Sequence, residues 1–221
     1  MPSLSAMKNL EPSYLTIIKT MKKYLKIIGI ALISCIMVSF CIPKGGPDLV
    51  TFNNSHEQIN KSNSSYEILV DFSKPSCEDR LFIYDVSHDQ KLVYSGVVLH
   101  GCGGASTPSK PEFSNEIGSH CSSLGEYTLE GIVKMKSGME AIKLKGWSDT
   151  NSNAEVRGIY IHTSIMATML PFNLPNANFP LTKASEGCFA VSYHTYHAIK
   201  KYMNADKSAN CKTTLIAYDG E

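Results

Sequence analysis

The sequence predicts a mainly β domain, a sandwich or a barrel, with a few short helices. Short apolar runs alternate with turn-forming residues from residue 66 onward, which is typical of β-strands joined by tight connections. A helical spacing of apolar residues is clear in one late segment, residues 193–203. No internal repeat is visible, and a chain of 221 residues is long enough for one such domain with appendages.

The first 42 residues are expected to lie outside this domain. Residues 1–41 contain five lysines and one acidic residue, and residues 27–42 form an apolar run without charge. A basic segment before a short apolar run is typical of a secretory signal peptide, and an uncleaved membrane anchor is the alternative. Residues 1–42 are therefore predicted to be a signal peptide or an N-terminal membrane anchor. The folded part is predicted to be exported to the periplasm or the cell envelope.

Residues 43–65 are rich in glycine, proline, asparagine and serine, and they are predicted to be a linker in which residues 49–52 dock onto the domain. The domain itself is predicted to span residues 66–221. The runs on either side of residues 87–90 are expected to form a hairpin, because a short polar turn joins them. Strands are expected at residues 67–72, 80–86, 91–100, 127–133, 141–144, 158–163 and 213–218, and in the run that begins at residue 188.

Charge and composition exclude several classes of function. The net charge is +1 and the basic excess lies in residues 1–41, so the sequence offers no electrostatic basis for binding nucleic acid. No cluster of histidine, cysteine or acidic residues has the spacing of metal ligands, so neither a metal nor a cofactor is expected. Hydrophobic residues make up 43% of the chain and charged residues 19%, which is typical of a globular protein rather than a disordered one.

The cysteine count points to at least one unpaired thiol. Five of the seven cysteines follow residue 42, and an exported chain with five cysteines leaves at least one thiol without a partner in the same chain. An unpaired cysteine in such a protein is either reactive or incidental, and its neighbours distinguish the two cases. The neighbours single out Cys188. The sequence leaves open whether the other four form disulfides: Cys77, Cys102, Cys121 and Cys211.

Cys188 has the sequence context of a nucleophile. It follows Gly187 in the motif Ser185-Glu186-Gly187-Cys188, and a glycine there allows a tight turn that brings a bare amide close to the thiol. Ser185 is expected to be a turn residue or a hydrogen-bond donor. His162 ends an apolar run upstream and is the candidate base, because a strand end can place its ring beside the thiol. The structural alternatives are a packed cysteine and a solvated strand-end histidine.

These residues, together with segments along the chain, resemble the murein L,D-transpeptidases with a YkuD-like catalytic domain. The motif Ser185-Glu186-Gly187-Cys188 is similar to the nucleophile motif of that family, and residues 118–127 are similar to its serine-rich segment. The resemblance covers residues 68–218, and it implies the family's β-sandwich or barrel with a helix after the nucleophile strand. The other similar segments are residues 68–75, 80–86, 98–101, 113–115 and 153–162.

The resemblance implies cysteine acyl transfer on peptidoglycan stem peptides. Cys188 would attack the carbonyl between the third residue and the terminal D-Ala of a stem tetrapeptide, and His162 would take the thiol proton and protonate the departing amine. Backbone amides near Gly187 and Cys188 would hold the oxyanion. An amine of a second stem peptide would then resolve the thioacyl enzyme and form a cross-link. The alternatives are an L,D-carboxypeptidase or amidase with the same pair, and an inactive wall-binding module.

Some positions depart from the family pattern and leave open how the substrate carboxylate is recognised. Thr163 stands where many relatives have glycine after the histidine, and Lys183-Ala184 replaces a Gly-Arg pair before the serine. Arg157 or Lys183 is expected to supply the missing cation. His100 is predicted to line the site as a structural residue. The serines of residues 118–127 are expected to serve loop packing.

Overall fold

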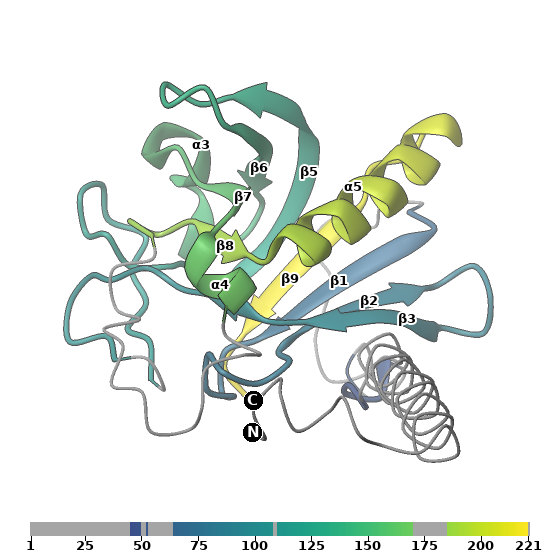
Figure 1. Ribbon diagram of the computed structural model, residues 1–221, viewed down its shortest axis with the longest axis horizontal. Helices are drawn as coiled ribbons and strands as arrows, with labels where there is room; N and C mark the ends of the chain where they lie inside the picture. The colour runs from purple at the N-terminus through teal and green to yellow at the C-terminus, as the bar shows by residue number, and fades with distance from the viewer. Residues whose placement is uncertain (1–44, 50–51, 53–63, 108–109, 170–184, 221) are drawn as a thin grey trace, which may run out of the picture. The chain divides into compact units, whose positions relative to one another are not determined.

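The computed structural model describes residues 45–49, 52, 64–107, 110–169 and 185–220 (Figure 1). The predicted signal peptide or anchor at residues 1–42 lies outside the described residues, as does the loop at residues 170–184 that includes Lys183. Within the described ranges, no helix combines the length and the apolar character that spanning a bilayer requires.

The described elements agree with a mainly β fold that contains a few short helices. Most strands have between four and seven residues, and one helix follows the strand next to Cys188. In chain order the elements are β1 (Tyr66–Asp71), β2 (Leu81–Asp85), β3 (Lys91–Gly96), β4 (Val98–Leu99), β5 (Gly125–Lys134), β6 (Glu140–Gly146), the 3-10 helix η2 (Asp149–Asn151), α3 (Ala154–Arg157), β7 (Tyr160–Thr163), α4 (Ile165–Met169), β8 (Phe189–Val191), α5 (Tyr193–Ser208) and β9 (Thr214–Tyr218).

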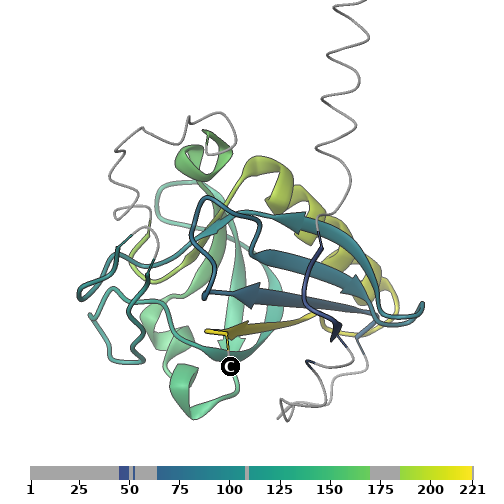
Figure 2. The ribbon, with the colours of Figure 1, turned by 90° about the horizontal axis from the view of Figure 1, so that it is seen from below.

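These strands form one sheet that curls back on itself (Figures 1 and 2). The strand order is β3-β2-β1-β9-β5-β6-β7-β8-β4. The two edge strands, β3 and β4, follow each other in the chain with only Val97 between them, so the two edges of the sheet come close together. The mainly β prediction is confirmed, and of the two predicted architectures the sheet has the barrel-like one.

The predicted strands match the observed ones except at residues 91–100. The sequence predicts one strand there, but the chain forms β3 and then β4, because at Val97 it leaves one edge of the sheet and joins the other. The predicted hairpin is confirmed, since β2 and β3 are antiparallel and Asp85 pairs with Lys91. The break at Val97 matters for the site, because β4 pairs with β8.

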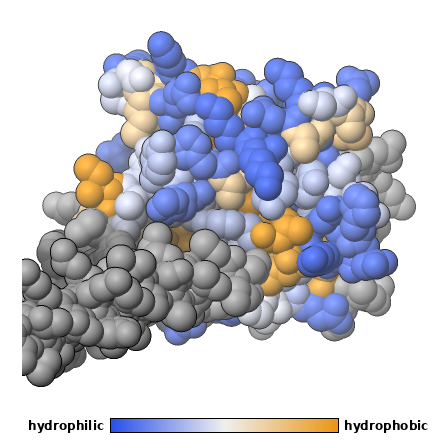
Figure 3. All heavy atoms as spheres, turned by 45° about the vertical axis from the view of Figure 1, so that its right-hand side comes forward, coloured by the Kyte–Doolittle hydropathy of each residue, from blue (hydrophilic) through white to orange (hydrophobic). Residues whose placement is uncertain are grey.

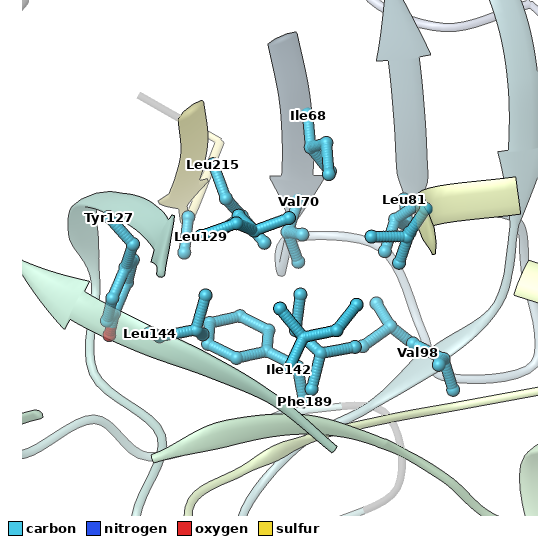
Figure 4. Close-up of a cluster of buried hydrophobic side chains, with 14 of the residues drawn as sticks. Ile68, Val70, Leu81, Val98, Tyr127, Leu129, Ile142, Leu144, Phe189 and Leu215 are labelled. Carbon is cyan, nitrogen blue, oxygen red and sulfur yellow. The ribbon is translucent and has the colours of Figure 1, made fainter. Parts of the chain in front are cut away.

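Alternate side chains of the strands fill the interior of the sheet. Figure 4 shows Ile68 and Val70 of β1 facing Ile142 and Leu144 of β6 across this core. Phe189 of β8 lies in the same cluster and is fully buried. The strand that follows the candidate nucleophile is therefore held in place by the main core.

Helix α5 packs on this core and confirms the helix predicted after the nucleophile strand. Tyr196, Ile199 and Met203 lie three or four positions apart, so they share one helical face, and all three are buried in the main cluster. Ser192 is the N-cap residue, and its hydroxyl accepts the backbone N–H of Thr195 at 3.0 Å. This cap fixes the start of the helix directly after β8.

A smaller cluster on the opposite face of the sheet includes part of the predicted linker. Leu49 and Phe52 are 1% and 6% exposed, and they belong to one cluster with Leu69 and Tyr84. The hydroxyl of Tyr84 donates a hydrogen bond to the carbonyl oxygen of Pro47 at 2.5 Å. These contacts hold the described residues between 47 and 52 against the outer face of the sheet.

Large apolar side chains on the surface are scattered. The face shown in Figure 3 is mostly hydrophilic, and its apolar residues form small separate groups among the described residues. The most exposed large apolar side chains in the described ranges are Ile117, Val156, Ile165 and Tyr193. Single exposed apolar residues of this kind are normal for a protein surface and do not form an apolar docking surface.

Candidate functional site

Cys188 and His162 lie on the same face of two neighbouring parallel strands. Strands β7 and β8 pair in register, with Ile161 opposite Phe189 and His162 opposite Ala190. Ile161 and Phe189 both point into the main core. Because side chains alternate along a strand, His162 and Cys188 both point to the other face, one strand apart and two positions along. The structure thus brings the two predicted catalytic residues to one surface.

The thiol of Cys188 is nearly buried and is held by backbone groups. Its side chain is 9% exposed, and Sγ accepts the backbone N–H of Tyr160 at 3.4 Å. The thiol in turn lies 3.6 Å from the carbonyl oxygen of Gly158, to which it donates. Burial raises the pKa of Cys188, and the Tyr160 amide and the charge of Arg157 offset only part of that effect. The resting group is a protonated thiol, so a nucleophile at this position requires a base.

His162 has the tautomer that a general base needs. Its Nδ1 lies 3.0 Å from the carbonyl oxygen of Thr163. Because a carbonyl oxygen can only accept a hydrogen bond, Nδ1 must carry the proton. Nε2 therefore keeps its lone pair in the neutral ring and is the nitrogen that can take a proton from a thiol. The ring is partly exposed, so an incoming molecule can reach it.

The turn before Cys188 depends on the residues of the motif. The hydroxyl of Ser185 donates to the carbonyl oxygen of Cys188 at 2.7 Å and closes the turn. Gly187 has a φ of 110°, in the region that favours glycine. A Cβ atom at this position would lie 2.8 Å from the carbonyl oxygen of Cys121. A side chain at Gly187 would therefore push the turn away from its support.

Ser122 is part of that support, a role that the sequence analysis missed. Its hydroxyl accepts the backbone N–H of Gly101 at 2.9 Å and donates to the carbonyl oxygen of Gly187 at 3.3 Å. The side chain is fully buried, so both bonds lie within the protein interior. The sequence suggested only loop packing, because Ser122 is separated from Gly187 by 65 positions. The only feature of the sequence that could have indicated this role is the place of Ser122 in the serine-rich segment.

Arg157 ties the serine-rich segment to the turn. Its Nη1 donates to the carbonyl oxygen of Ser114 at 2.8 Å and to the hydroxyl of Ser123 at 3.2 Å. Its Nη2 donates to the carbonyl oxygen of Cys121. The same nitrogen would lie 3.1 Å from a Cβ atom at Gly187. The structure thus places this guanidinium beside the turn, where these hydrogen bonds occupy it.

His100 is buried and bonded within the fold. Nη2 of Arg80, a fully buried residue, donates to Nδ1 of His100 at 2.8 Å. His100 Nε2 then donates to the carbonyl oxygen of Thr107 at 2.9 Å. Burial and the charge of Arg80 lower the pKa of His100 to about 4, so the ring is neutral at ordinary pH. Because both ring nitrogens have partners, His100 stabilises the loop at residues 101–107 rather than transferring protons.

The pKa shift of His100 predicts a loss of stability in mild acid. The ordinary pKa of histidine is about 6.5, so the unfolded chain binds a proton below that pH while folded His100 does not until about pH 4. Its contribution to stability is complete above pH 6.5 and declines as the pH falls toward 4, by at most about 1.4 kcal/mol per pH unit. Urea unfolding at several pH values measures this effect.

The matched control for this prediction is His100→Gln, which keeps a donor and an acceptor but does not titrate. The difference in unfolding free energy between the native chain and this variant is expected to shrink from pH 7 to pH 4.5. A difference that stays constant over this range would show that His100 does not titrate as inferred.

The chemistry available at this site is that of a thiol and an imidazole with backbone amides close by. In the described part of the chain, no three histidine, cysteine or acidic side chains are grouped as metal ligands would be. A partly exposed imidazole with a free lone pair, on the same face as a thiol, can activate the thiol for attack on a carbonyl carbon. The arrangement is suited to nucleophilic acyl transfer.

Comparison with known proteins gives one family match and several similar structures. The L,D-transpeptidase catalytic domain matches residues 47–210. Bd1075 from Bdellovibrio bacteriovorus is 18% identical to this chain, with a TM-score of 0.40. The similarity covers 73% of this chain and 51% of Bd1075, so this chain spans about half the length of Bd1075. An L,D-transpeptidase (residues 123–326) from Xylanimonas cellulosilytica DSM 15894 is 14% identical to this chain, with a TM-score of 0.34. That similarity covers 79% of this chain and 70% of the other. None of the curated proteins matches.

The family match includes every described strand except the last. The match starts at Pro47, whose carbonyl oxygen accepts a hydrogen bond from the hydroxyl of Tyr84. It continues past Cys188 and includes the whole of α5. It thus contains both candidate catalytic residues and the segments that support them. Because the match covers well over half of the 221 residues, the chain belongs to the family of L,D-transpeptidase catalytic domains.

Proposed function

We propose that the protein is a peptidoglycan L,D-transpeptidase in which Cys188 is the nucleophile and His162 is the base. The observation that supports this most directly is their position on one face of β7 and β8, with Nδ1 of His162 fixed by the carbonyl oxygen of Thr163. The substrates are stem peptides of peptidoglycan. The reaction then takes place in the periplasm or elsewhere in the cell envelope, to which the N-terminal segment directs the chain.

The first half-reaction forms a thioacyl enzyme. His162 Nε2 takes the proton of the Cys188 thiol, and the sulfur attacks the carbonyl carbon between the third residue and the terminal D-Ala of a stem tetrapeptide. The backbone amides of Gly187 and Cys188 stabilise the oxyanion, and losing one such donor typically costs about 10²–10³ in rate. When the tetrahedral intermediate collapses, the protonated His162 gives its proton to the departing D-Ala amine.

The second half-reaction transfers the acyl group to an amine. The side-chain amine of a second stem peptide attacks the thioacyl carbon, and His162 takes the proton that this amine loses. Collapse releases the Cys188 sulfur, which regains a proton, and leaves an amide cross-link between the two stems. The partly exposed position of His162 agrees with a base that serves two different substrates in turn. The chemistry needs no cofactor.

Incubation with purified tetrapeptide muropeptides, followed by mass analysis, tests this proposal. The expected products are free D-Ala and cross-linked dimers. Free D-Ala with tripeptide and no dimers would replace the proposal with an L,D-carboxypeptidase that uses the same pair. Neither product, together with no covalent adduct on Cys188 after treatment with a carbapenem, would indicate an inactive wall-binding module.

A further inference from the structure

Arg157 is a half-buried cation beside the nucleophile turn, and the proposed mechanism gives it no part. Its two terminal nitrogens carry four N–H groups and make four hydrogen bonds. Nη1 donates to the carbonyl oxygen of Ser114 and the hydroxyl of Ser123, and Nη2 donates to the hydroxyl of Ser119 and the carbonyl oxygen of Cys121. A substrate carboxylate could bind these nitrogens only by displacing one of the four partners.

Among the residues that the structure describes, no carboxylate forms an ion pair with Arg157. The four acceptors of its terminal nitrogens are uncharged carbonyl and hydroxyl oxygens. The carboxylate of Glu155, on the same helix α3, pairs instead with Lys143 at 2.9 Å. The guanidinium thus keeps its positive charge beside the turn, in a place that solvent only partly reaches.

The short segment that begins at Arg157 also contacts the thiol of Cys188. Arg157 is the last residue of α3, and Gly158 ends this helix with a φ of 67°, in the left-handed region. The carbonyl oxygen of Gly158 lies 3.6 Å from the thiol, and the N–H of Tyr160 donates to Sγ at 3.4 Å. The end of α3 therefore places backbone groups against the sulfur while the side chain of Arg157 reaches the turn before it.

Arg157 holds the backbone on which the turn rests. A Cβ atom at Gly187 would lie 2.8 Å from the carbonyl oxygen of Cys121 and 3.1 Å from Nη2 of Arg157. The same Nη2 donates to that carbonyl oxygen. The guanidinium, the carbonyl group and Gly187 therefore pack together. Gly187 and Cys188 supply the amides proposed to hold the oxyanion, so a shift of the guanidinium would move those amides.

Two charged side chains act on the Cys188 thiol with opposite signs. Burial raises the pKa of Cys188 most, the charge of Arg157 lowers it, and the charge of Glu186 raises it. The side chain of Glu186 is 81% exposed, and its carboxylate lies 3.9 Å from Nδ1 of His120. Water and salt screen such an exposed charge more than they screen a half-buried one. Arg157 is therefore the stronger of the two influences on the thiol.

Three further titratable side chains face Cys188. His162 and Tyr160 lie on the same face of β7, and Tyr127 of β5 interacts with the thiol from the core. Burial raises the pKa of Tyr127 to about 12, so its phenol is uncharged at neutral pH. The titration of Cys188 belongs to the thiol and the His162 ring together, so all variants are compared with His162 in place.

We propose that Arg157 is a positioning residue for Cys188, which clamps the serine-rich segment under the nucleophile turn and stabilises the thiolate by its charge. The thiolate forms when His162 takes the thiol proton, and no other reactant is involved. The charge of Arg157 makes the sulfur available for attack, and the clamp keeps the amides of Gly187 and Cys188 in place. The effect on catalysis rests on the proposed function, whereas the effect on the thiol does not.

Alkylation of the full chain by iodoacetamide at a series of pH values measures the charge effect, with Cys188 followed by peptide mapping. In Arg157→Gln the pH profile of Cys188 is expected to move up by roughly 0.5–1 pH unit, which slows alkylation at neutral pH by about 3- to 10-fold, because one partly screened cation is lost. Arg157→Lys keeps the charge and should restore the native profile. No shift in Arg157→Gln, or the same shift in both variants, would overturn the proposal.

Two control variants make the alkylation test specific. Lys143→Gln removes a cation that pairs with Glu155 on α3, and it is expected to leave the profile unchanged. A shift as large as that of Arg157→Gln would mean that any lost cation has this effect, and would contradict the assignment. Glu186→Gln removes an exposed carboxylate, so the fold is expected to survive and the profile to move down at low salt. A profile that does not move down would overturn the proposal.

The rate of acylation by a carbapenem measures the clamp. Lysine lacks the planar fork of donors, so Arg157→Lys is expected to be acylated roughly 10- to 100-fold more slowly, although its alkylation profile is native. Acylation at the native rate would overturn the clamp. A native protein that is not acylated, together with the shifted profile of Arg157→Gln, would reject the proposed function and support the charge effect. An acylated native protein with no shift in the variant would do the opposite.

Discussion

Replacing Cys188 by alanine is expected to reduce D-Ala release from stem tetrapeptides by roughly 10⁴-fold or more, because no other group replaces the nucleophile. Covalent capture of a carbapenem should be lost as well. The fold is expected to survive, since the substitution removes one sulfur atom and leaves the adjacent Phe189 in the core. The rate of D-Ala release and the intact mass after carbapenem treatment measure these two effects.

The matched control is Cys77→Ala, which removes an exposed thiol far along the chain from the turn. This variant is expected to keep both the rate and the adduct. The two variants differ only in which thiol is missing, so together they separate a nucleophile from a general effect of cysteine loss. An adduct of unchanged yield on the Cys188→Ala protein would show that another residue is acylated.

Replacing Arg80 by methionine is expected to lower the free energy of unfolding by about 3–5 kcal/mol, because three buried acceptors lose their donor and each such loss costs about 1–3 kcal/mol. The Nε of Arg80 donates to the carbonyl oxygen of Val98 at 2.8 Å, and Nη1 donates to that of Lys74 at 2.9 Å. Nη2 donates to His100 Nδ1. Methionine fills similar volume but leaves all three acceptors without this donor, in a place that water does not reach.

Urea unfolding of the variant measures this loss. Lys136→Met is the control, because Lys136 is exposed in the turn between β5 and β6 and its replacement should change stability by less than about 0.5 kcal/mol. Burial lowers the pKa of Arg80 to about 9, so the guanidinium is charged at neutral pH and its hydrogen bonds are charge-assisted. A variant as stable as the native chain would mean that the three acceptors find other donors at little cost.

Strand positions were predictable because they depend on neighbours in the sequence. Short continuous apolar runs identify β1 and β2, and the helical spacing of Tyr196, Ile199 and Met203 identifies α5. The break at Val97 was not predicted, because a single glycine such as Gly96 also occurs within continuous strands and does not by itself indicate where a strand ends. It depends on which edge of the sheet is free, and only the assembled sheet determines that.

In the site too, features set by neighbours in the sequence were predicted and features set by distant contacts were not. Cys188 and His162 stood out because each sits in a local motif and because the motifs occur in the order of a known family. Ser122 and Arg80 did not stand out, because their partners lie 65 and 20 positions away, respectively. Contacts across such separations leave no periodic trace in a single sequence. Thus the sequence singles out the two residues that we propose as the reacting groups, but it does not single out Ser122 and Arg80, which support the site.

The place of β9 in the sheet has a consequence for how the chain folds. This last strand lies between β1 and β5, so it is the hydrogen-bonded junction between the two halves of the sheet. The halves cannot join until residues 214–218 have left the ribosome, and a pairing between the first and last strands is slow because a long loop must close. Assembly of the complete sheet therefore waits for this long-range pairing, and β3-β2-β1 and β5-β6-β7-β8-β4 can form only as separate parts before β9 is in place.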